Sequence, residues 1–184
     1  MKTYIYMVRH GDSPKGVGLE ERTRELSTKG MADAHKVMDV LAQEGISYFY
    51  SSPYIRAVQT IEALAEAMGS SLVLEEDLRE MRFMEGNRPL QHMFADPDFA
   101  LTGGESARMW TERAVRVLRQ ILVNHRGERI AVGTHGAVMT LMMRYWDEQY
   151  GLDFVRQTSK PDIYKLEFRE EQLLQVERIV LPAS

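Results

Sequence analysis

Two histidines in this chain each follow a short apolar run and stand directly before a glycine. Arg9-His10-Gly11 follows the run from Tyr4 to Val8, and Thr134-His135-Gly136 follows a second run from Ile130 to Gly133. A neutral imidazole is a nucleophile, and a neighbouring arginine supplies a fixed positive charge for an anionic substrate. The two histidines are therefore candidates for one site that acts on an anion.

A third candidate is Arg56, which follows Ser51-Ser52-Pro53 near the expected start of a helix. A helix N-terminus presents free N–H groups and a positive dipole, and both attract an anion. A cation in the first turn is unfavourable unless a negative group lies nearby, and a guanidinium suits a phosphate because it can bind in a bidentate manner. Together with His10 and His135, Arg56 indicates a phosphate site rather than an ordinary exposed arginine.

An alternation of strand and helix patterns would position these residues. Nearly unbroken apolar runs are typical of parallel strands buried on both faces, and segments with apolar residues at helical spacing separate them. The expected strands cover residues 4–8, 46–50, 72–74 and 130–133, with a hairpin pair at 163–168 and 173–179, and the expected helices start near residues 27, 52, 107 and 137. This pattern predicts an α/β three-layer sandwich, in which a mostly parallel central sheet has helices on both faces. Ligands of such sheets bind beyond the carboxyl ends of the strands, so His10, Ser51-Ser52 and His135 should meet in one crevice.

Length and composition predict a single domain over residues 1–184. Residues 81–104 have no clean period and are expected to form a short connection or cap. Without cysteine, the chain cannot use thiol catalysis, disulfides or cysteine-ligated zinc. The formal net charge of -4 argues against nucleic acid as the main partner, and no apolar run approaches the ~20 residues that cross a membrane. We therefore expect a cytoplasmic protein without a membrane partner.

Five ordered motifs together resemble the histidine phosphatase superfamily, in its phosphoglycerate-mutase-like branch. They are Arg9-His10-Gly11, Ser51-Ser52-Pro53 with Arg56 and Thr60, Leu78-Arg79-Glu80, Gly103-Gly104-Glu105-Ser106 and Thr134-His135-Gly136. The resemblance covers about residues 3–146 and implies a phosphoglycerate-mutase-like fold. It also implies that His10 is the nucleophile that becomes phosphorylated, that Arg9, Arg56 and His135 form the phosphate pocket, and that Glu80 donates a proton.

Elementary chemistry agrees with these implied roles. Nearby arginines disfavour the imidazolium form and so lower the pKa of His10. Arg9, Arg56 and a protonated, donating His135 would meet the charge on the transferring phosphoryl oxygens without a metal ion. The leaving alkoxide needs a carboxylic acid of raised pKa, which is Glu80 by resemblance, with Asp12 as the alternative acid. No third histidine or carboxylate lies at helix-type ligand spacing around either histidine, so no metal site is expected.

The predicted function is that of a metal-independent phosphatase, which needs no cofactor and hydrolyses small-molecule phosphomonoesters through phospho-His10. A phosphoprotein is the less favoured substrate. Ser13, Arg82 and His92 are candidate substrate-binding residues, because Ser13 follows the first motif and the other two lie in the 81–104 segment.

Three other functions stay open. The first is a phosphoglycerate-type mutase, although such mutases continue after the Arg-His-Gly triplet with Glu-Ser and a downstream asparagine, whereas Asp12-Ser13-Pro14 stands here. They also carry a longer, more basic insertion than residues 81–104. The second is a phosphohistidine protein phosphatase, whose open cleft would admit a side chain of a partner protein. The third, from another class, is a catalytically idle phosphate-binding module.

Overall fold

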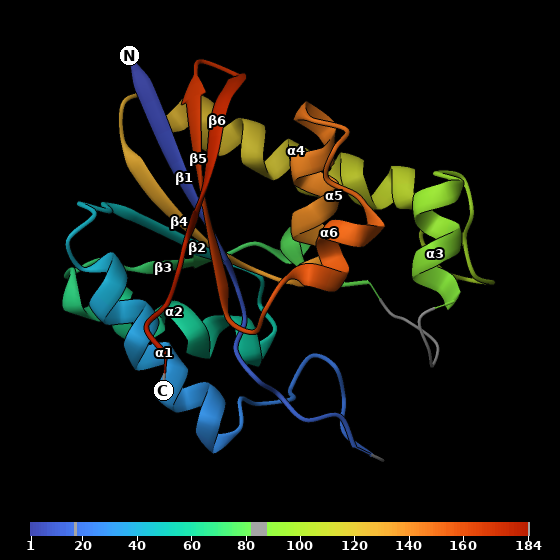
Figure 1. The fold of residues 1–184 in the computed structure, drawn as a ribbon, viewed down its shortest axis with the longest axis horizontal. Helices are drawn as coiled ribbons and strands as arrows, with labels where there is room; N and C mark the ends of the chain where they lie inside the picture. The colour runs from blue at the N-terminus through green and yellow to red at the C-terminus, as the bar shows by residue number, and fades with distance from the viewer. Residues whose placement is uncertain (17, 82–87, 184) are drawn as a thin grey trace.

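A mixed β-sheet forms the centre of the molecule (Figure 1). The structure is a computed structural model that describes residues 1–16, 18–81 and 88–183. Within those residues the sheet has six strands in the order β3-β2-β4-β1-β5-β6. Their bounds are β1 (Lys2–Arg9), β2 (Tyr48–Ser51), β3 (Leu72–Leu74), β4 (Arg129–Thr134), β5 (Asp162–Arg169) and β6 (Gln172–Ile179). Strands β3, β2, β4 and β1 run parallel, whereas β5 pairs antiparallel with both β1 and β6. This arrangement confirms the predicted sheet and its C-terminal hairpin.

Helices cover both faces of this sheet, as the sequence predicts. They are α1 (Thr28–Leu41), α2 (Ile55–Ala67), α3 (Arg88–Ala95), α4 (Ala107–Asn124), α5 (Gly136–Trp146) and α6 (Leu152–Gln157), with a short 3₁₀ helix, η1 (Glu76–Leu78). Alternate residues of β1 point to opposite faces. Ile5 and Met7 pack with α4 and α5, whereas Tyr6 and Val8 pack with α1 and α2. Two cores therefore hold the central strand in place. None of the described helices is long and apolar enough to cross a membrane.

The start of α2 differs from the prediction. We expect Ser52-Pro53 at the N-cap and first turn, but the helix begins at Ile55 and Tyr54 is its N-cap. The reason is that Ser52 still belongs to the sheet edge, since its N–H donates to the carbonyl of Gly133 at 2.9 Å. The α1 prediction is confirmed, because the hydroxyl of Ser27 caps that helix.

Residues 81–104 contain a helix that the sequence pattern does not predict. Helix α3 covers Arg88–Ala95 and lies beyond the ends of α4 and α6 (Figure 1). Its Met93 is buried, and Leu90 and Phe94 pack against the core of α4 and α5. Eight residues give too few turns for a helical period to stand out from the surrounding prolines and glycines. The short helix α6 is missed for the same reason.

The carboxyl ends of the central strands are tied together by backbone hydrogen bonds. The N–H of His10 donates to the carbonyl of Thr134 at 3.1 Å, so the residue after β1 is still paired with the end of β4. The N–H of Ser52 likewise continues the pairing of β2 with β4. The side chains that follow these three strands are consequently held at one edge of the sheet.

Candidate active site

His10 leaves the end of β1 with its ring buried, at 6% exposure. The Nδ1 atom lies 2.8 Å from the carbonyl oxygen of Gly11. Because a carbonyl oxygen accepts but never donates, Nδ1 carries the ring proton and Nε2 keeps its lone pair. The Nε–H of Arg56 donates to Nε2 at 3.3 Å. His10 therefore presents a nucleophilic nitrogen that faces a guanidinium.

The charge state of His10 follows from its surroundings. Burial, and then the positive charges of Arg56, Arg9 and Lys160, hold the pKa of His10 well below its ordinary value, against the opposing effect of the Gly11 carbonyl. Each of these cations disfavours a second positive charge on the ring. The imidazole is thus neutral at physiological pH, as the sequence predicts.

Arg56 lies in the first turn of α2 and is almost completely buried, at 1% exposure. Its Nη1 donates to the carbonyl of Glu21 at 2.5 Å, and its Nη2 donates to the Glu21 carboxylate at 2.9 Å. The expectation that a negative group accompanies this cation is therefore correct, and in the free protein that group is a side chain. The Glu21 carboxylate is therefore the anion that pairs with Arg56 at the candidate phosphate site.

Arg9 closes the site from the side of α5. Its Nη1 donates to both the carbonyl and the hydroxyl of Thr158. The guanidinium lies against the backbone of Gly136, where an added Cβ would stand 2.6 Å from Arg9 Cζ. A larger residue at position 136 would therefore force the Arg9 guanidinium to move. Arg9-His10-Gly11 and Thr134-His135-Gly136 therefore pack against each other through Arg9 and Gly136.

His135 follows β4 and is completely buried. Its ring centroid lies 5.2 Å from that of His10, and its Nε2 lies 2.8 Å from the hydroxyl of Ser52. Burial, and then the positive charges around it, hold the pKa of His135 well below its ordinary value. Burial and these charges favour the neutral form of the His135 ring, and the protonated form expected during phosphoryl transfer stays a prediction.

Glu80 follows η1 and lies near enough to Arg56 and Arg9 for their charges to act on its carboxyl group. Its carboxylate accepts hydrogen bonds from the N–H of Met81 at 3.3 Å and from the N–H of Ala137, in the first turn of α5, at 3.4 Å. Burial raises the pKa of Glu80, while Arg56 and Arg9 oppose that rise. A carboxyl that holds its proton more firmly than usual can serve as an acid. Asp12, the alternative acid, accepts instead from the hydroxyl of Ser27 at the start of α1.

The loop between β1 and α1 adds two residues that sequence reasoning misses. Arg24 is buried, and its Nη2 donates to Glu21 Oε2 at 3.2 Å, the same oxygen that Arg56 binds. Partial burial by itself would raise the pKa of Glu21, but Arg56 and Arg24 outweigh it and lower that pKa. Glu21 is therefore ionised and bridges two guanidiniums. The sequence signal for this arrangement is the cluster of charged residues at 20–25, and that cluster does not indicate which of the charges form ion pairs.

The structure describes two of the three candidate substrate-binding residues, Ser13 and His92. Ser13 is buried and its hydroxyl donates to the carbonyl of Glu25 at 2.6 Å, so it holds the loop together. His92 is exposed on α3, and its ring lies 5.0 Å from that of Phe99. Arg82 lies outside the described residues. Substrate contact by any of the three stays a prediction.

Among residues 1–16, 18–81 and 88–183, no group of three or more histidine, aspartate or glutamate side chains is placed to hold a metal ion. The positive charges that act on His10 come from Arg56, Arg9 and Lys160.

The family model of the histidine phosphatase superfamily (branch 1) matches residues 5–179. The chain belongs to this superfamily. Among curated relatives, phosphoglycerate mutase-like protein 4 of Arabidopsis thaliana is 31% identical over 155 residues, which are 73% of this chain and 67% of the relative.

Solved structures agree with this assignment at the level of the fold. A mycobacterial glucosyl-3-phosphoglycerate phosphatase superposes with a TM-score of 0.79 at 19% identity, over 100% of both chains. A mutant phosphoserine phosphatase of Entamoeba histolytica, in complex with phosphoserine, superposes with a TM-score of 0.76 at 19% identity, over 94% of each chain. The fold predicted from the sequence is thereby confirmed.

Proposed function

We propose that this histidine phosphatase hydrolyses small-molecule phosphomonoesters through a phosphohistidine intermediate on His10. The observation that carries the proposal is the orientation of the His10 ring. Its Nδ1 proton is fixed on the Gly11 carbonyl at 2.8 Å, which leaves the Nε2 lone pair directed at Arg56 beside His135. A nucleophile held in one tautomer among phosphate-binding cations is what phosphoryl transfer to nitrogen requires.

In the first step, Nε2 of His10 attacks phosphorus and the bond from phosphorus to the ester oxygen breaks. Arg9 and Arg56 offset the charge on the non-bridging oxygens, so the arginines supply the electrostatic stabilisation. A bound phosphate dianion would also raise the pKa of His135, which burial and then the neighbouring positive charges lower. His135 then gains a proton on phosphate binding and donates a hydrogen bond to the substrate.

Glu80 completes the reaction in both steps. Its carboxylic acid gives a proton to the departing alkoxide, and the product alcohol leaves. The resulting carboxylate accepts a proton from water as the water oxygen attacks the phosphorus of phospho-His10, and the bond from nitrogen to phosphorus breaks. The balance is ester plus water giving alcohol plus inorganic phosphate, with His10 and Glu80 restored. The raised pKa of Glu80 supports the acid role.

A mutase is the second candidate, and the relative named as mutase-like favours it. The two activities differ in the fate of the phosphoryl group. A hydrolase passes it to water, whereas a phosphoglycerate-type mutase returns it to a second hydroxyl and depends on a bisphosphate primer. The named activities of the two structural neighbours, both phosphatases, support hydrolysis as the first choice.

A panel of phosphomonoesters with the wild-type protein tests the proposal. It includes 3-phosphoglycerate with and without a bisphosphate primer, and it is repeated after exhaustive metal chelation. Release of inorganic phosphate that needs neither primer nor metal supports the hydrolase. Isomerisation of phosphoglycerate that needs the primer, with little phosphate release, would identify a mutase instead.

The pH dependence of kcat/KM should have two limbs. Activity rises as His10 loses its proton, at a pH below the ordinary histidine value because its pKa is lowered. It falls as Glu80 loses its proton, at a pH above the ordinary glutamate value because its pKa is raised. We expect Glu80→Gln to remove the falling limb and to leave the rising limb in place. Measuring both proteins on one alkyl phosphate cancels the titration of the substrate, and an unchanged falling limb would contradict the assignment.

Glu21→Gln should bind inorganic phosphate more tightly than the wild type. The Glu21 carboxylate competes with phosphate for Arg56 and Arg24, so removing its charge frees both guanidiniums. The expected gain is about fivefold, equivalent to the ~1 kcal/mol of a partly exposed ion pair. The inhibition constant of phosphate measures it, with Glu76→Gln, which breaks an exposed pair with Arg22, as the control. Weaker phosphate binding would mean that Glu21 orients Arg56 rather than competing for it.

A further inference from the structure

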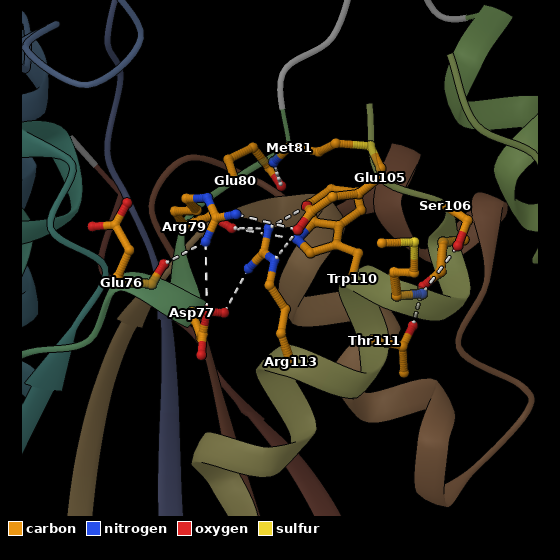
Figure 2. A network of polar contacts seen from close by, with 12 residues as sticks. Glu76, Asp77, Arg79, Glu80, Met81, Glu105, Ser106, Trp110, Thr111 and Arg113 are labelled. Carbon is orange, nitrogen blue, oxygen red and sulfur yellow. Dashed lines mark hydrogen bonds and ion pairs between the residues drawn. The ribbon is translucent and has the colours of Figure 1, made fainter. Parts of the chain in front are cut away.

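A second ionic network lies next to Glu80 and joins the residues of η1 and its end to α4 (Figure 2). Its centre is the carboxylate of Glu105, which belongs to the Gly103-Gly104-Glu105-Ser106 motif. Arg113 donates to both Glu105 oxygens, from Nε at 2.8 Å and from Nη2 at 3.0 Å, and Arg79 donates to one of them at 3.2 Å. Arg113 is only 6% exposed. A buried guanidinium is thus neutralised and fixed by one carboxylate.

The same guanidinium also binds the backbone that leads to Glu80. Nη1 of Arg113 donates to the carbonyl of Asp77 at 2.5 Å, and Nη2 donates to the carbonyl of Arg79 at 3.0 Å. The indole N–H of Trp110 donates to the Arg79 carbonyl as well, at 3.3 Å. That carbonyl belongs to the peptide bond between Arg79 and Glu80. Two side chains of α4, those of Arg113 and Trp110, therefore donate hydrogen bonds to the peptide group that precedes Glu80.

Helix α4, which carries Arg113 and Trp110, is itself held in place by burial, an N-cap and packing. Trp110 is completely buried, and Ser106 caps the helix by accepting from the N–H of Met109 at 3.1 Å. Helix α4 packs against α5, whose Ala137 N–H binds the Glu80 carboxylate. Glu80 is consequently held at its backbone by α4 and at its carboxylate by α5, and these two helices share one core.

We propose that Arg113 and Trp110, with Glu105 fixing Arg113, are positioning residues for the proton donor Glu80. The inference rests on the proposed function, because it assigns a task to the residues behind the acid of that reaction. A general acid acts within hydrogen-bond reach of the leaving oxygen, and a displacement of ~1 Å can cost about a hundredfold in rate. A guanidinium that bridges the carbonyls of Asp77 and Arg79 limits such displacement, which a single ion pair cannot do.

Arg113→Lys tests the proposal, because a lysine can still pair with Glu105 but cannot also bind both carbonyls. We expect kcat/KM for an alkyl phosphate to fall about tenfold to a hundredfold. The value for p-nitrophenyl phosphate, whose leaving group hardly needs a proton, should change by less than about threefold. Arg119→Lys, on an exposed turn of α4 and paired with Glu171, is the matched control and should leave both substrates unaffected.

A double-mutant cycle with Glu80→Gln separates positioning from general loss of structure. If Arg113 acts through Glu80, Arg113→Lys should cost nothing further on the alkyl phosphate once the acid has been removed. The same loss in both backgrounds, or equal losses on both substrates, would overturn the proposal. Thermal unfolding of each variant shows whether it folds. Should Arg113→Lys fail to fold, Trp110→Phe removes one hydrogen bond to the Arg79 carbonyl and keeps the ring, and it should shift the substrate ratio about twofold to fivefold in the same direction.

The outcomes for the two assignments are distinct. If Glu80→Gln itself affects both substrates equally, the acid role fails, and the positioning role fails with it. If Glu80→Gln discriminates between the substrates while Arg113→Lys and Trp110→Phe do not, the acid role stands and the positioning role alone is refuted.

Discussion

Replacing His10 with alanine should lower turnover of every phosphomonoester by at least about 10⁴-fold, because the reaction then lacks its nucleophile. The arginines and His135 stay in place and still bind phosphate, so the loss should appear in kcat rather than in substrate affinity. Initial rates on p-nitrophenyl phosphate and on an alkyl phosphate measure it. His35→Ala, which changes an exposed histidine on α1, is the matched control and should keep full activity.

Trapping the intermediate makes the same experiment specific to nitrogen. Rapid denaturation of wild type during turnover should yield protein-bound phosphate that is labile in acid and stable in base, as phosphohistidine is. The His10→Ala protein should yield none. Turnover at the wild-type rate by this variant would refute the mechanism, and trapped phosphate of unchanged amount would place the nucleophile elsewhere.

The sheet and the meeting of the two histidines could be predicted because both follow from strong local signals. Apolar runs too long for a half-exposed strand indicate buried parallel strands, and the residues after such strands share one edge. The approach of His10 to His135, at 5.2 Å between ring centroids, is the direct result. The α4 and α5 helices were equally predictable, because their apolar faces repeat over several turns.

The remainder of the site depends on contacts that leave no periodic trace in the sequence. The loop that brings Glu21 onto Arg56 is irregular, and the choice among its charges is made in three dimensions. The charge state of His135 likewise depends on burial and on which cations surround it, and neither can be counted along the chain. The segment before α4 illustrates the same limit, since α3 is too short to show a period.

The two carboxyl groups near Arg56, those of Glu21 and Glu80, have pKa values shifted in opposite directions. Glu21 is partly exposed and shared by two guanidiniums, so its pKa falls. Glu80 is screened from water more than it is stabilised by Arg9 and Arg56, so its pKa rises. We expect phosphate to displace the ionised Glu21 carboxylate from Arg56. Glu80, whose pKa is raised, can then protonate the leaving group.

Glu80→Gln should divide substrates by the basicity of their leaving groups. An alkyl phosphate expels a strongly basic alkoxide, so kcat/KM should fall about 10²–10⁴-fold when the acid is lost, whereas p-nitrophenyl phosphate should change by less than about threefold. Glutamine keeps the shape of the side chain, and its one carbonyl oxygen can still accept from the N–H of Ala137, while the contact with the N–H of Met81 is lost. The comparison uses kcat/KM because this ratio covers the steps up to phosphorylation of His10 and excludes the later hydrolysis.

The second role of Glu80 then appears in a separate measurement on the same variant. Without the base that activates water, phospho-His10 should hydrolyse slowly, so p-nitrophenol should be released in a burst equal to the enzyme concentration, followed by a slow steady state. Glu75→Gln, which changes a half-buried carboxylate of the same acidic segment, should show neither effect. Equal losses of kcat/KM on both substrates would argue against Glu80 as the acid. Loss on the alkyl phosphate without a burst on p-nitrophenyl phosphate would keep the acid and require another group as the base, because one carboxyl that changes role between the two steps must slow both when it is removed.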